Sequence, residues 1–138
     1  MADTSGTEAL LEAGAAILAL VLPPAGFIYQ LTRHGRGSGG DFATGRFTRG
    51  SQFIEFHVRH SLGLVTYGWD DLTLSHADYL RGLGASGAYP GYSDDPLDGF
   101  RHLALDLAGP LSGFRDGDRR GFERGLQTAA QPPGRRLP

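Results

Sequence analysis

The chain has 138 residues, 40% of them hydrophobic and 20% charged, and this balance is typical of one globular domain that buries a single core. The formal net charge of -2 excludes a broad positive surface for nucleic acid or anionic membrane. The absence of cysteine excludes disulfide bonds and thiolate chemistry.

The basic residues are all arginine, and lysine and asparagine are absent. This bias is typical of a GC-rich genome and favours a bacterial source. The segment MADTSGTE is acidic, whereas a signal peptide begins with basic residues. The apolar run from Ala9 to Leu31 is interrupted by Pro23, Pro24 and Gly26, whereas a spanning helix needs about 20 apolar residues. We therefore expect a cytoplasmic protein without a membrane segment.

The first elements are a helix over 7–22, after a flexible start at 1–6, and a strand over 27–33. The following HGRGSGGD contains the spacing G-x-G-x-x-G at Gly35, Gly37 and Gly40. A dinucleotide site needs a helix after these glycines, but the next segment, DFATGRFTRG, has the composition of a strand. We therefore predict a hairpin loop, with an anion-binding nest helped by Arg33 and Arg36 as the alternative.

Residues 53–71 alternate between apolar and polar side chains and predict two antiparallel strands. A two-residue turn at Ser61 and Leu62 would pair Ile54 with Trp69, Phe56 with Tyr67, and Val58 with Val65. A turn near Gly50 would set Arg46 against Glu55. We expect Phe56, Tyr67 and Trp69 to be buried.

Helical periodicity follows the strands. Ser75 is the expected N-cap of a short helix, and Gly84 is expected to end that helix. Asp95 is the expected N-cap of a second helix, and a last helix is expected at about 118–130. The tail 131–138 is expected to be disordered. The sequence therefore predicts one α+β domain over 7–130: an N-terminal helix, a four-stranded antiparallel meander, and two to three C-terminal helices on one sheet face.

The polar side of the predicted sheet carries the first candidate site. Glu55, His57 and Arg59 alternate along one strand and would point the same way, with Arg46 as a neighbour across the sheet. A histidine beside an acid and a guanidinium can act as a general base or orient an anionic ligand. The same residues are equally ordinary on the solvated side of an antiparallel sheet, which is the interpretation we favour.

The loop AYPGYSDDP is the second candidate, because Tyr89, Tyr92 and Asp94 crowd a segment directly before a helix. Tyrosines in loops supply contact area for partners, but they can also cover the edge of the core. A third row, Asp98, His102 and Asp106, falls on one helical stripe. The row could hold a divalent ion if another element closed over it, but it lies opposite Phe100 and Leu107, so we favour a solvated row and predict no metal site.

The chain contains no nucleophile elbow, no phosphate-binding loop with its lysine, and no signature of a cofactor. The sequence therefore favours a non-enzymatic protein-binding or regulatory module, whose partner is another protein rather than nucleic acid or membrane. The alternative is a small-ligand-binding protein or acid-base enzyme that uses Glu55, His57 and Arg59. The partner's identity and the oligomeric state stay open.

Overall fold

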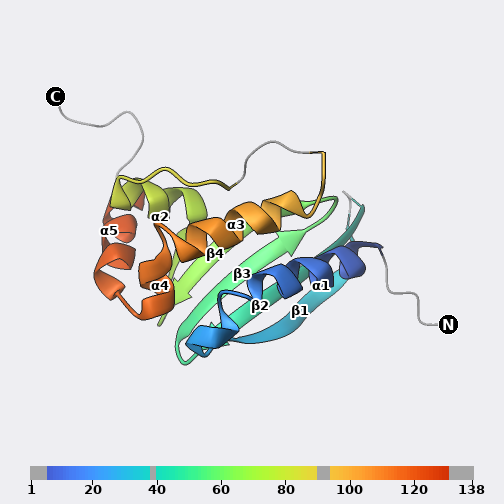
Figure 1. Cartoon of the computed structure of the whole chain (residues 1–138), viewed down its shortest axis with the longest axis horizontal. Coiled ribbons are helices and arrows are strands. Elements are labelled where there is room, and N and C mark those ends of the chain that lie inside the picture. The colour runs from blue at the N-terminus through green and yellow to red at the C-terminus, as the bar shows by residue number, and fades with distance from the viewer. Residues whose placement is uncertain (1–5, 38–39, 90–93, 131–138) are drawn as a thin grey trace.

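The computed structural model describes residues 6–37, 40–89 and 94–130, and in them it shows an α+β protein (Figure 1). The predicted tail and all of the predicted flexible start except Gly6 lie outside these residues. The elements are, in chain order, α1 (Gly6–Leu18), the 3₁₀ turn η1 (Pro23–Ala25), β1 (Ile28–Gly37), β2 (Gly40–Arg49), β3 (Gln52–Val58), β4 (Leu62–Trp69), β5 (Leu72–Ser75), α2 (His76–Leu83), α3 (Asp98–Ala108), α4 (Ser112–Asp116) and α5 (Arg119–Ala129).

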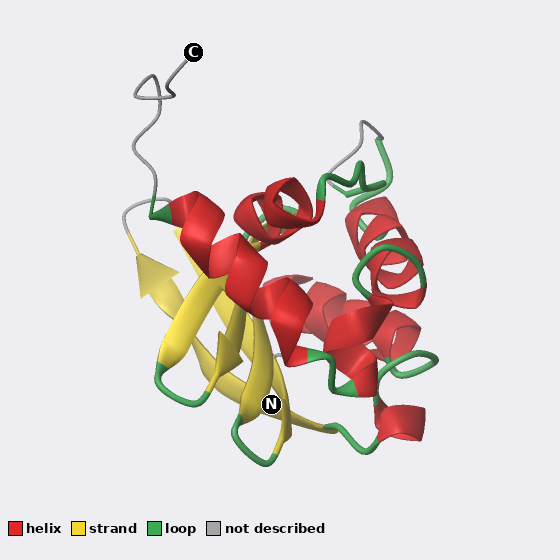
Figure 2. Ribbon diagram, turned by 90° about the vertical axis from the view of Figure 1, so that its left-hand side faces the viewer, coloured by secondary structure: helices red, strands yellow, loops and turns green. Residues whose placement is uncertain are grey.

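The strands form one antiparallel sheet in the order β1-β2-β3-β4-β5, and the helices lie to one side of it (Figure 2). In Figure 1, α1 and α3 lie over the sheet, while α2, α4 and α5 gather at one end. The prediction of an α+β fold with an antiparallel sheet is confirmed, but the strand number of four is wrong. β5 is the missed strand: it is four residues long and joins β4 through a turn at Asp70, whose φ is 57°.

Two helix boundaries differ from the prediction, and one helix was not predicted. The first helix ends at Leu18, and the chain reaches the proline pair through turns that still bury Leu22. α3 begins at Asp98, and the Asp95 carboxylate accepts the backbone N–H of Leu97 ahead of it. The short helix α4 was not predicted, because five residues are too few for a periodic signal.

Several predicted details are confirmed. The Ser75 side chain accepts the backbone N–H of Asp78, and Gly84 ends α2 in the left-handed conformation. Arg46 pairs with Glu55 across β2 and β3. These features are local, so short-range sequence rules could find them.

The predicted register of β3 and β4 is wrong by two residues. Ile54 lies opposite Tyr67 and Phe56 opposite Val65, while Trp69 lies opposite Gln52. An irregularity between Phe56 and Val58 lets Val58 pair with Leu62. Because side chains alternate with a period of two, a shift of two residues keeps every side chain on its predicted face.

The core fills the space between the sheet and the helices. Ile54, Phe56 and Val58 are fully buried, and Phe56 packs edge-on against Phe100 of α3. Trp69, predicted to be buried, is only half-buried, because it lies near the end of β4 against α5. The helices therefore cover the predicted apolar face and leave the opposite side chains of the sheet uncovered by any described helix.

Candidate functional site: the open sheet face

The open face is the side of the sheet that points away from the helices (Figure 2). Strand pairing places Thr44 opposite His57 and Arg46 opposite Glu55 on this face. Its central side chains are Phe42, Thr44, Arg46, Phe53, Glu55, His57, Leu64 and Thr66. The structure therefore brings together three predicted candidates, Arg46, Glu55 and His57, and shows which contacts hold them.

One end of the open face is a stack of side chains on Gly68. The Phe53 ring lies so close to Gly68 that an added Cβ would be 1.9 Å from it. The Arg46 guanidinium lies 4.0 Å from the Phe53 ring centroid. Its Nε and Nη2 donate to Oε2 of Glu55 at 3.2 and 2.9 Å. The phenylalanine is thus held between a glycine and a paired guanidinium, although it faces away from the core.

His57 is held at the other end of the open face. Its Nδ1 lies 2.9 Å from the Thr44 hydroxyl, and its ring stacks on Phe42 at 5.6 Å. Burial lowers the pKa of His57, the positive charges of Arg59 and Arg33 lower it further, and Glu55 only partly opposes them. The imidazole is therefore neutral at pH 7, and among the described residues its second nitrogen, Nε2, has no partner.

Between these ends the open face is hollowed. A depression of about 460 Å³ is lined by Thr32, Arg33, Thr44, Glu55, His57, Leu64 and Thr66. Its size lies within the range of small-molecule sites. His57 and Glu55 were predicted candidates, whereas Leu64, which is 66% exposed, was not predicted. An apolar residue at an outward position of a predicted strand was the available signal.

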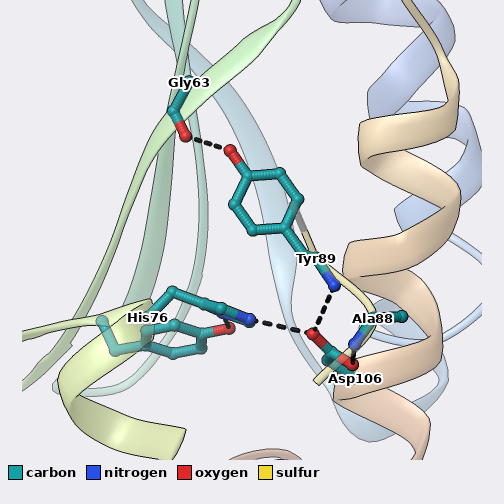
Figure 3. A network of polar contacts seen from close by, with 6 residues as sticks. Gly63, His76, Ala88, Tyr89 and Asp106 are labelled. Carbon is teal, nitrogen blue, oxygen red and sulfur yellow. Dashed lines mark hydrogen bonds and ion pairs between the residues drawn. The ribbon is translucent and has the colours of Figure 1, made fainter. Parts of the chain in front are cut away.

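A second polar cluster lies buried on the helical side of the sheet (Figure 3). Nε2 of His76 lies 2.9 Å from Oδ2 of Asp106, and its Nδ1 lies 2.8 Å from the Tyr67 hydroxyl. The Asp106 carboxylate also accepts the backbone N–H groups of Ala88 at 2.6 Å and Tyr89 at 3.0 Å. Asp106 is 2% exposed and His76 is 5% exposed.

The prediction of a solvated row is therefore wrong for Asp106. The segment that contains Ala88 and Tyr89 packs over this position of α3 and turns it into a buried one. Both nitrogens of His76 are hydrogen-bonded within the fold, so its ring has no free nitrogen for a substrate. Burial lowers the pKa of His76 against the opposing effect of Asp106. The cluster connects β4, α2, α3 and the segment before residue 90, and we interpret its role as stabilisation of the fold.

The tyrosine loop is only partly described. Tyr89 is half-buried, and its hydroxyl donates to the backbone oxygen of Leu62 at 3.1 Å and to that of Gly63 (Figure 3). Burial raises the pKa of Tyr89 to about 12. Asp94 is exposed, and Tyr92 lies outside the described residues. These contacts support the interpretation that Tyr89 covers an edge of the sheet.

Beside Tyr89 lies a second hollow, of about 690 Å³, between β4, α2 and residues 84–89. Its apolar lining includes Leu64, Val65 and Leu80. Its bordering polar side chains have partners within the fold: Ser75 caps α2, Arg81 pairs with Asp78, and the Tyr89 hydroxyl and His76 ring are hydrogen-bonded to other residues. The hollow therefore offers surface for an apolar group, and its described polar side chains already have partners within the fold.

Gly37 pairs with Gly40 where β1 and β2 meet, so the glycine spacing lies in a hairpin and lacks the helix that a dinucleotide site requires. Among the side chains that the structure describes, no group of three potential metal ligands is present. No described helix has the length and hydropathy needed to cross a bilayer.

The fold and site thus define an α+β protein whose five-stranded antiparallel sheet is helix-covered on one face and open on the other. In comparisons with known proteins, no family model matches the chain, and no curated protein or solved structure matches it either.

Proposed function

We propose that this protein is a small non-enzymatic protein-binding module and that the open face is its binding surface. The observation that carries the proposal is the set of aromatic and arginine side chains that fix one another there, with Arg46 on Phe53 and with Arg33 and Arg59 on Phe42. Arginine and aromatic side chains are enriched where partner proteins bind most strongly. Because these side chains are already held in place, binding immobilises few additional rotamers.

Charge favours an acidic partner. Three arginines, Arg33, Arg46 and Arg59, lie on or beside the open face, whereas its central acidic residue is Glu55, which is paired with Arg46. A complementary acidic surface would be steered to this side of the molecule. The composition further favours a module of the bacterial cytoplasm.

Two exposed leucines provide a matched test of the binding face. Leu64 is 66% exposed on the open face, and Leu105 is 62% exposed on α3. Peptides selected from a displayed random library against the wild-type protein should be acidic. They should lose affinity for Leu64→Gln and bind Leu105→Gln as they bind the wild type. If the two variants bind the selected peptides equally, or if no peptide can be selected, the proposal is wrong.

A small-ligand or acid-base function is the second candidate, and the hollow of about 460 Å³ beside His57 and Glu55 is the observation that favours it. Thr44 engages Nδ1 of His57, so Nε2 is the ring nitrogen available to a substrate proton. A ligand that binds only the native state must raise its apparent stability. We would therefore screen small anionic metabolites by thermal unfolding of the wild type and of His57→Gln. This function would be excluded if no ligand stabilises the wild type, or if every stabilising ligand raises the stability of His57→Gln equally.

A further inference from the structure

We infer that Arg33, Phe42, His57 and Arg59 form a carboxylate-binding subsite within the open face, which takes an acidic side chain of the partner protein. This inference rests on the proposed function and names the chemistry of one contact within it. The Phe42 ring is the centre of the subsite. The guanidinium carbons of Arg33 and Arg59 lie 5.8 and 5.7 Å from its centroid, and the His57 ring stacks on it at 5.6 Å.

Separate strands supply these groups, so the backbone sets their relative positions. Arg33 follows a register shift in β1 between Leu31 and Arg33, and it pairs with Thr44 of β2. His57 lies on β3, opposite the same Thr44, and Arg59 directly follows the end of this strand. The shift in β1 thus places Arg33 beside the residue that holds the imidazole.

The charges around His57 favour an anion. Arg33 of β1, Arg59 after β3 and Glu55 of β3 are the charged groups that act on its ring. The neighbouring side chains from β2 and β4, Thr44, Leu64 and Thr66, carry no charge. Glu55 is held by two hydrogen bonds from Arg46, and Arg33 has no acidic partner in the described part of the chain. Among these described side chains, Arg33 is therefore the guanidinium that can receive the carboxylate of a partner.

A carboxylate matches the donors that are present. Planar guanidinium groups bind carboxylates through two parallel hydrogen bonds, and a protonated His57 would add an N–H donor. Leu64 lines the same hollow and is exposed, so an acidic residue carried on a polypeptide can bury apolar surface beside its carboxylate. A free inorganic anion gains nothing from that leucine, which favours a protein as the source of the carboxylate.

Binding at this subsite is coupled to proton uptake. Burial and the two arginines lower the pKa of His57, and a carboxylate beside the ring opposes the effect of the arginines. The pKa of His57 therefore rises when the carboxylate binds. By reciprocity, the carboxylate binds more tightly as the pH falls through the pKa of His57.

The test follows the His57 ring by NMR during titration with a capped oligoglutamate peptide. The matching oligoglutamine peptide and sodium phosphate at equal ionic strength are the comparison probes. We expect oligoglutamate alone to shift the His57 ring signals and to raise the pKa of His57. Its affinity should fall at least about tenfold in Arg33→Gln, as expected when a hydrogen bond to a charged group is lost. Arg120→Gln, which removes the same charge from a side chain that is 89% exposed on α5, should bind as the wild type does.

Each other outcome overturns the inference. Equal binding by Arg33→Gln and Arg120→Gln would show that Arg33 is not a ligand of the carboxylate. An equal shift with oligoglutamine would show that the carboxylate is not recognised, and an equal shift with phosphate would assign the subsite to free anions. Shifts at Phe53 and Leu64 without any at His57 would overturn the subsite and leave the module standing. Failure of the peptide selection, by contrast, removes the module itself.

Discussion

Replacement of Asp106 by asparagine should destabilise the fold strongly, because the change leaves buried donors without an anionic acceptor. The carboxylate accepts from His76 and from the backbone N–H groups of Ala88 and Tyr89, at a position that is 2% exposed. Hydrogen bonds to a charged group contribute about 1.5 to 3 kcal/mol each, and an amide oxygen can still accept some of them. We therefore expect a loss of about 3 kcal/mol, which is a large part of the roughly 5 to 15 kcal/mol that stabilises a typical domain.

Urea unfolding monitored by circular dichroism measures this loss, with Asp98→Asn as the matched control on the same helix. Asp98 pairs with Arg101 at the exposed surface, and surface ion pairs contribute about 0 to 1 kcal/mol. Asp106→Asn should thus lower the free energy of unfolding by at least about 2 kcal/mol more than Asp98→Asn does. Equal losses in the two variants would refute the role of Asp106 as the acceptor that ties the segment before residue 90 to α3.

Three further predictions concern stability and can be measured by the same unfolding experiment. Phe56→Ala should cost about 3 to 5 kcal/mol, because the ring is fully buried against Phe47 and Phe100, and a loss under about 1 kcal/mol would place it outside the core. Ser75→Ala should cost about 1 kcal/mol by removing the cap of α2, whereas Ser75→Thr, which keeps a hydroxyl, should cost less. The stabilisation by neutral His76 should be complete above about pH 6.5 and lost as the pH falls through its lowered folded pKa, so the gap between the wild type and His76→Gln should shrink on acidification. A constant gap would show that folding leaves the pKa of His76 unchanged, and a gap that grows would show that the folded protein prefers the charged ring; either result would refute the prediction.

Sequence periodicity predicted the two faces of the sheet but not the register between β3 and β4. A shift by one residue would have placed Ile54 and Phe56 in solvent, so the alternation excludes it. A shift by two residues keeps both in the core, so the hydrophobic pattern does not distinguish it from the observed pairing. The deciding feature is the irregularity between Phe56 and Val58, which has no signature in the alternation.

Asp106 shows a different limit of sequence reasoning. Helical periodicity describes one element, and it correctly separates Asp106 from the stripe of Phe100. It carries no information about a distant segment that covers the other side of the helix. Ala88 and Tyr89 bury Asp106 through backbone N–H groups, which every residue except proline possesses, so their side chains give no hint of the contact.

The contrast between the two polar clusters explains why we assign binding to the open face. In the buried cluster, the His76 nitrogens, the Tyr67 hydroxyl and both oxygens of Asp106 are hydrogen-bonded within the fold. Such a cluster stabilises the fold, and any ligand would have to break a bond in order to bind it. On the open face, Arg46 and Glu55 form an ion pair with each other. Among the described residues, however, Arg33 has no acidic partner, and Nε2 of His57 has no hydrogen-bond partner. Capacity for recognition therefore remains at the Phe42 end of the open face, where a partner gains new hydrogen bonds without disrupting existing ones.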